Sequence, residues 1–86
     1  MAALSDVETA CLRLLIGWSQ QGKTSATAEQ VIECLSIDRD QYDAAMRKMR
    51  AIGAVHHVTI GDHSHFADEF HIRSHSSLRV LEESVQ

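Results

Sequence analysis

All six histidines of the chain lie between positions 56 and 75. His63 and His65 are two residues apart, so both rings would share one face of an extended strand, and imidazole is a common zinc ligand. His57 and His71 each alternate with apolar residues, and we expect them to face outward as neighbours on adjacent strands. No cysteine accompanies them, so the sequence predicts no metal site and leaves these four histidines as weak candidates.

The same histidines suggest a pH-sensitive surface. Imidazole has a reference pKa of about 6.5, so at lower pH this segment would gain positive charge and attract phosphate or an acidic protein. In the plainer alternative the segment is a polar, solvated hairpin, with His56 partly buried near Val58 and Ile60. Both interpretations remain open at the level of the sequence.

Reactive side chains form no catalytic arrangement. We expect Cys11 on a buried helical stripe and Cys34 at the edge of an apolar face, and two cysteines alone make neither a disulfide framework nor a metal site. Gly22-Lys23-Thr24 lacks the earlier glycine of a phosphate-binding loop. The sequence therefore predicts no enzyme and no cofactor.

Composition sets the broad class of the protein. The chain has 86 residues, with 8 Lys and Arg against 12 Asp and Glu, a formal charge of -4. This length predicts a single domain over residues 1–86. The longest apolar run, 14–16, is far below the ~18 residues of a membrane span, and the start lacks the pattern of a secretory signal. We expect a cytoplasmic protein with no membrane partner, and any basic surface can only be local.

Three helix starts follow one another along the first part of the chain. Each has a capping residue and a Glu or Gln three positions later, the pattern in which two side chains satisfy backbone amides at a helix start. The apolar periodicity that follows each box predicts helices over residues 5–20, 28–35 and 39–52. Ile37 and Tyr42 are placed to form a hydrophobic staple, and Gly53 is placed to end the third helix.

After Gly53 the apolar period changes from 3.6 to 2, which predicts an antiparallel hairpin over 55–74 with a long tip. Residues 23–26 are a candidate for a short third strand. Ser76 or Ser77 is expected to begin a last helix, over 77–85. The predicted fold class is therefore α+β, mainly α.

The first predicted helix is apolar on two sides. One side is expected to face the core, and it carries Val7, Ala10, Cys11, Leu14, Leu15 and Trp18. Leu12 and Ile16 lie opposite, which indicates burial on a second side. Either the last helix covers them within one chain, or they meet a second copy of the chain. The second alternative predicts a dimer interface made by Leu12, Ile16, Leu78, Leu81 and Val85.

Residues 31–55 (VIECLSIDRDQYDAAMRKMRAIGAV) resemble the core motif of the winged helix-turn-helix superfamily. The shared features are a Leu before a short turn with a polar cap, then a long helix that ends in Gly and an apolar pair. They are carried by Leu35, Ser36, Ile37, Asp38, Met46, Met49, Gly53 and Val55. The resemblance covers about residues 5–75. It implies three helices, a hairpin wing and a C-terminal helix.

The resemblance also implies a function. In this superfamily the third helix enters the major groove of double-stranded DNA and the wing touches the backbone. By this resemblance the chain would be a small DNA-binding transcriptional regulator that acts as a dimer. The contacts would come from Arg39, Gln41, Ala44, Arg47, Lys48, Arg50 and Arg73.

The charges in the third helix leave a second function open. Asp40 and Asp43 stand among its four basic residues and reduce the number of phosphate contacts that it can supply. Both acids would also favour the positive helix N-terminus without any ligand. The alternative is a winged-helix module that binds a protein and no DNA, and the two differ in whether the basic side chains converge on one face.

Overall fold

The computed structural model describes residues 4–59 and 69–85, and for residues 57–59 and 85 it describes the backbone alone. The described part is mainly helical with a small antiparallel sheet, which confirms the α+β class. The elements in chain order are α1 (Asp6–Gln20), β1 (Ser25–Thr27), α2 (Ala28–Leu35), α3 (Arg39–Ile52), β2 (Val55–Thr59), β3 (Glu69–Ile72) and α4 (His75–Val85).

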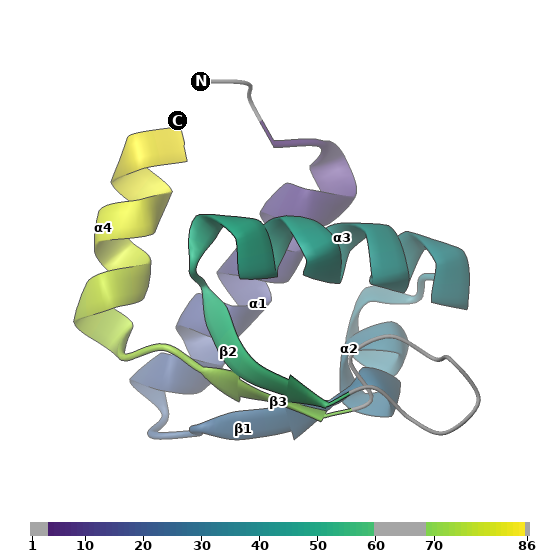
Figure 1. Ribbon diagram of the computed structural model, residues 1–86, viewed down its shortest axis with the longest axis horizontal. Coiled ribbons are helices and arrows are strands. Elements are labelled where there is room, and N and C mark those ends of the chain that lie inside the picture. The colour runs from purple at the N-terminus through teal and green to yellow at the C-terminus, as the bar shows by residue number, and fades with distance from the viewer. Residues whose placement is uncertain (1–3, 60–68, 86) are drawn as a thin grey trace.

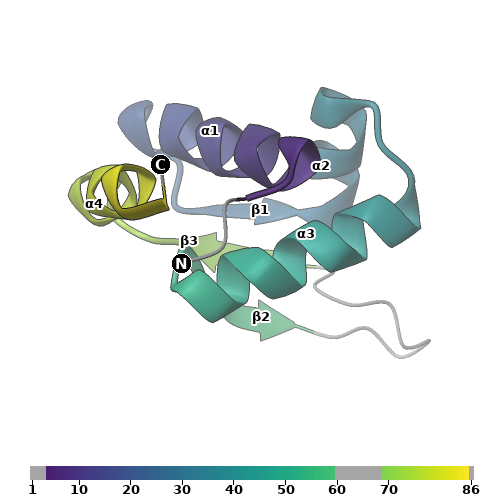
Figure 2. The ribbon, with the colours of Figure 1, turned by 90° about the horizontal axis from the view of Figure 1, so that it is seen from above.

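The sheet has the strand order β1-β3-β2, with both pairings antiparallel. Helices α1 and α3 run over the same face of this sheet, and α4 stands beside α1 at one end (Figures 1 and 2). The third strand expected near residues 23–26 is therefore present, one to two residues later. It pairs with β3, the last strand in the chain, which makes β3 the central strand.

The three capping boxes are confirmed. In each box the third helical side chain accepts the backbone N–H of the capping residue: Glu8 from Ser5 at 2.9 Å, Gln30 from Thr27 at 3.0 Å, and Gln41 from Asp38 at 3.1 Å. At α3 the return bond runs from the Gln41 N–H to Asp38 Oδ1 at 2.8 Å. Gly53 ends α3 with φ +85, the left-handed conformation that glycine adopts without strain.

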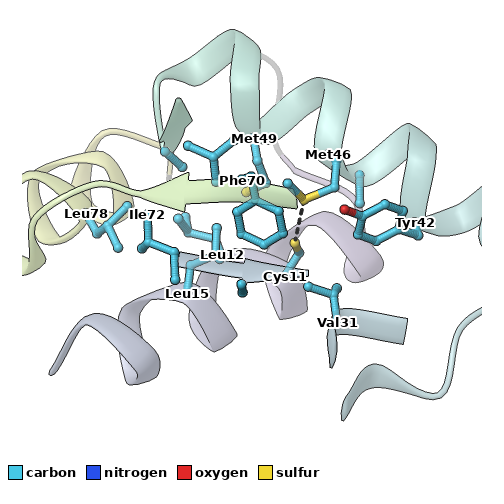
Figure 3. Packing of buried hydrophobic residues seen from close by; sticks show 14 of the residues in the cluster. Cys11, Leu12, Leu15, Val31, Tyr42, Met46, Met49, Phe70, Ile72 and Leu78 are labelled. Atoms are coloured by element: carbon cyan, nitrogen blue, oxygen red, sulfur yellow. Dashed lines mark hydrogen bonds between the residues drawn. The ribbon is translucent and has the colours of Figure 1, made fainter. Parts of the chain in front are cut away.

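The core is centred on one sector of α1 (Figure 3). The buried residues of α1 are Cys11, Leu12, Leu15 and Ile16, whereas Leu14 is half-buried and Ala10 is exposed. The predicted inward face of this helix is thus wrong in part, because the buried sector is rotated toward Leu12 and Ile16. Helix α4 accounts for this rotation, since it packs along α1 and covers the side of Leu12 and Ile16.

The predicted dimer interface is wrong at three of its five positions. Leu12, Ile16 and Leu78 are buried within a single chain, so they are not available to a second copy. Leu81 is half-buried against the core, and the side chain of Val85 lies outside the described residues. Covering of α1 by the last helix within one chain, the other alternative, is what the structure has.

Helix α4 begins at His75, two residues before the predicted start. Ser74 lies at its start, where its Oγ accepts the Ser77 N–H at 3.4 Å. The Ser19 hydroxyl donates to the carbonyl of Ile16 at 2.7 Å and lies 3.1 Å from His75 Nδ1. The contact between Ser19 and His75 joins the start of α4 to the end of α1.

The histidine pairing also differs from the prediction. His71 faces His56 across the β2–β3 ladder, with ring centroids 5.7 Å apart, whereas the sequence suggested His57. A register shift between His56 and Thr59 separates this pair from the Thr59–Glu69 pair, and a bulge of this kind leaves no mark in the apolar alternation. In β3 the alternation holds, since Phe70 and Ile72 are buried and His71 is exposed. His63 and His65 lie outside the described residues, as does the side chain of His57.

We predict that Asp38→Ala lowers the free energy of unfolding by about 1 kcal/mol, because the α3 amides lose their capping carboxylate. Urea unfolding followed by circular dichroism measures the change. Asp40→Ala is the matched control, since it removes the same charge from the first turn of α3 without removing a cap. Equal losses in the two variants would mean that charge, and not the capping bond, matters at Asp38.

Candidate functional site

Helix α3 presents one face to solvent along its whole length. Tyr42, Ala45, Met46 and Met49 are buried beneath it. The opposite ridge is exposed and consists of Asp40, Ala44, Arg47 and Ala51. Two of these four side chains are methyl groups, so another molecule can approach the helix backbone closely on either side of Arg47.

The N-terminal half of α3 is close to charge balance. Arg39 Nε lies 3.6 Å from Asp43 Oδ1, with about a third or less of either side chain exposed, and the Arg39 guanidinium lies 5.3 Å from the centre of the Tyr42 ring. This ion pair holds Arg39 against its own helix. The Gln41 side-chain oxygen is occupied in the capping box. Arg39 and Gln41, predicted as DNA contacts, therefore have structural roles at the start of α3.

The C-terminal half of α3 is basic. It carries Arg47, Lys48 and Arg50, and Arg73 joins them from the segment after β3, because its Nε donates to the Gly53 carbonyl at 3.1 Å. Arg47, Arg50 and Arg73 are exposed and Lys48 is half-buried. Positive charge at this end also suits the negative pole of the helix dipole. Apart from Arg39, which is paired with Asp43, the basic residues of α3 thus gather at its C-terminal end.

Acidic side chains border the other end. Helix α2 exposes Glu29 and Glu33 and contains no Lys or Arg. Asp40 and the paired Asp43 continue this acidic surface onto the first turns of α3. The surface of α2 and α3 therefore has an acidic half and a basic half, and Asp43 and Arg47, their nearest members on α3, are separated by about 6 Å along the helix at a rise of roughly 1.5 Å per residue.

An apolar groove adjoins the basic end of α3. It encloses about 350 Å³ and is lined by Ile52, Gly53, Arg73, Ser77, Val80 and Leu81. Val80 is 62% exposed, although it is a large apolar residue. The apolar period of residues 77–85 marks the side of Leu78 and Leu81 as buried and gives no sign of a second apolar side. At 100° per residue Val80 lies on the opposite side of the last helix from the buried Leu78.

A second hollow lies on the far side of α1. It encloses about 500 Å³ and is lined by Asp6, Thr9, Ala10, Arg13, Leu14 and Leu35. Its apolar walls come from residues that the sequence placed in the core, and its rim carries one acid and one base. The rotation of α1 toward α4 leaves this side of the helix half-exposed.

The two cysteines differ in chemistry. Cys11 is buried, with its Sγ 4.0 Å from Met46 Sδ (Figure 3). Burial, together with the negative charge of Glu8, raises the pKa of the Cys11 thiol from 9.0 to about 12. The thiol therefore stays protonated and unreactive at neutral pH, whereas Cys34 is an exposed free thiol. Within residues 4–59 and 69–85 no three potential metal ligands come together.

Comparison of the chain with models of protein families, with curated proteins and with solved structures finds no match in any of the three. Among the described residues, no helix has the length and apolar character needed to cross a membrane.

We predict that the native protein reacts with one equivalent of an aromatic disulfide reagent at pH 8, through Cys34. With a pKa of about 12, only about one Cys11 thiol in ten thousand is a thiolate at that pH. In urea the second equivalent should react. The variant Cys34→Ser should show no rapid reaction until it unfolds, and rapid labelling of this folded variant would contradict the burial of Cys11.

Proposed function

We propose that this chain is a winged-helix domain that binds double-stranded DNA, with α3 in the major groove and the β2–β3 hairpin as the wing. The order of elements supports the proposal, since three helices are followed by two antiparallel strands and α3 is exposed along its length. A role as a small transcriptional regulator in the cytoplasm follows from this proposal and from the two free thiols.

The basic end of α3 is the observation that carries the proposal. Arg47 projects from the exposed ridge between Ala44 and Ala51, so its guanidinium can reach a groove that the two methyl groups do not obstruct. Arginine donates in pairs to the O6 and N7 atoms of guanine, or to phosphate oxygens. Lys48 and Arg50 flank Arg47, and Arg73 adds a fourth positive charge beside the end of the helix.

This geometry predicts weak binding with a modest salt dependence. Each phosphate contact contributes about -0.9 to the slope of log affinity against log salt. Three or four contacts per chain then give roughly a hundredfold loss of affinity between ~50 mM and ~200 mM salt. A dimer would supply twice as many contacts, and its loss would be correspondingly steeper.

The acidic half of the surface favours a second function. Glu29, Glu33, Asp40 and Asp43 repel phosphate at the end of α3 that would read bases in a helix-turn-helix protein. A basic partner protein would meet no such repulsion. The domain would then be a protein-interaction module that uses α2 and the start of α3 and binds no DNA.

We predict that Arg47→Ala lowers the affinity for random-sequence duplex DNA at ~50 mM salt about five- to tenfold and reduces the salt slope by about one. Fluorescence anisotropy at ~50 mM and ~200 mM salt measures both quantities. The matched control is Arg13→Ala, which removes the same charge from an exposed position on α1.

Equal effects of Arg47→Ala and Arg13→Ala would mean that attraction is diffuse and that α3 is not the contact. A folded wild-type protein that does not bind duplex DNA at ~50 mM salt would overturn the proposal and favour the protein-interaction module.

A further inference from the structure

One side of α1 carries an acid and a base that lie in line along the helix. Asp6 and Arg13 are both exposed, and both line the hollow on the far side of α1. They are seven residues apart, so they point to the same side within about 20°, at roughly 100° per residue. Figure 2 shows α1 along one edge of the molecule, with the sheet and α3 on its other side, so another molecule can reach this face of α1.

Small side chains stand midway between these two charges. The midpoint falls between Thr9, which is half-buried, and Ala10, which is exposed. Leu14 and Leu35 form apolar walls of the hollow beside Ala10, and both are half-buried. Two helices approach each other closely where the side chains between them are short. The middle of this face therefore offers short side chains and adjoining apolar surface to a second helix.

We propose that a second copy of this chain docks on this face, with the two α1 helices antiparallel and the two-fold axis between Thr9 and Ala10. Such an axis brings each position of one helix opposite the position equally far beyond the axis on the other helix. Asp6 then faces Arg13 of the partner subunit, and Arg13 faces Asp6 of the partner subunit. Because both residues lie on the same side of the helix, the two ion pairs are equivalent and form together.

The arrangement of charge selects a second copy in this orientation. Parallel α1 helices would place Asp6 opposite Asp6 and Arg13 opposite Arg13 of the partner subunit, so like charges would meet. Glu8 is the remaining charged residue of α1, and it is turned about 160° away from Asp6 at roughly 100° per residue. Its carboxylate accepts the Ser5 N–H in the capping box. The exposed face of α1 therefore carries one acid and one base, and an antiparallel copy presents the same two charges in the reverse order.

The two charges set the orientation of the pair, and the apolar walls of the hollow supply attraction. Ion pairs at an exposed surface add little affinity, but they disfavour arrangements in which like charges meet. The hollow gives each subunit apolar surface that the other can remove from water. We therefore expect a weak dimer that forms as the concentration rises. It differs from the interface predicted from the sequence, since it uses the exposed side of α1 and not the buried Leu12 and Ile16.

This proposal does not depend on DNA binding, because self-association is measured without DNA. The two proposals share Arg13, which is the control position of the DNA measurement. Asp6→Ala separates them, since loss of an acid raises the affinity of a surface for phosphate unless the dimer contributes to binding. A loss of DNA affinity in both Asp6→Ala and Arg13→Ala would therefore come from the dimer contact, and the failure of either proposal leaves the other testable.

Sedimentation equilibrium of the full chain from ~10 µM to ~1 mM is the first experiment. The apparent mass of the wild type should rise from 9.6 kDa toward twice that value. Ala10→Lys should remain a monomer throughout, because it places two like charges beside the axis. Val80→Lys is the matched control, since it adds the same charge beside the groove on α4 and should dimerise as the wild type does. Both positions are exposed, so both variants should keep the circular dichroism spectrum of the wild type.

Two outcomes overturn the proposal directly. One is a folded wild type that stays monomeric at ~1 mM, which would leave this face of α1 to a different partner or to solvent. The other is a dimer that Val80→Lys disrupts and Ala10→Lys leaves intact, which would move the interface to the groove between α3 and α4.

A charge exchange tests the antiparallel register. Asp6→Arg and Arg13→Glu each place like charges opposite one another in the pair and should weaken the dimer at least about fivefold. The double variant restores opposite charges and should recover most of the wild-type affinity. Two single variants that weaken the dimer without recovery in the double variant would contradict the pairing of Asp6 with Arg13 of the partner subunit.

Discussion

The packing of α1 against the other three helices is the constraint on which the structure depends. A chain of 86 residues can build only a small core, and here one sector of α1 supplies its centre through Cys11, Leu12, Leu15 and Ile16. Helix α3 covers one flank of this sector and α4 covers the other. Because α3 packs its apolar side against one flank of α1, its polar ridge faces outward and forms part of the exposed surface of the molecule.

The local parts of the fold could be predicted from the sequence, and the reason is physical. A capping box involves residues three positions apart, so Asp38 with Gln41 marks the start of α3 without reference to the rest of the chain. The inward face of α1, by contrast, cannot be predicted from residues close in the sequence. Apolar residues occupy most of its circumference, and only the position of α4 decides that Leu12 is buried and Ala10 is exposed.

The candidate site likewise has features that the sequence can predict and features that depend on contacts between distant segments. The exposure of Asp40, Ala44, Arg47 and Ala51 follows from the helical period once Tyr42, Met46 and Met49 face the core. The grouping of the basic residues depends on contacts between distant segments, above all the bond from Arg73 to the Gly53 carbonyl across 20 positions. The pairing of Arg39 with Asp43 is an i, i+4 contact within α3, a spacing that can be recognised in the sequence.

The central position of β3 has a consequence for the order in which the molecule can fold. Phe70, Ile72 and Leu78 complete the core, and they belong to the last two of the seven described elements. During synthesis α1, α2 and α3 therefore emerge before β3 and α4, and the three helices can pack on one another while part of their apolar surface stays uncovered. Their caps allow each helix to form early, but stable burial waits for β3 to pair with β1 and β2 and for α4 to pack against α1.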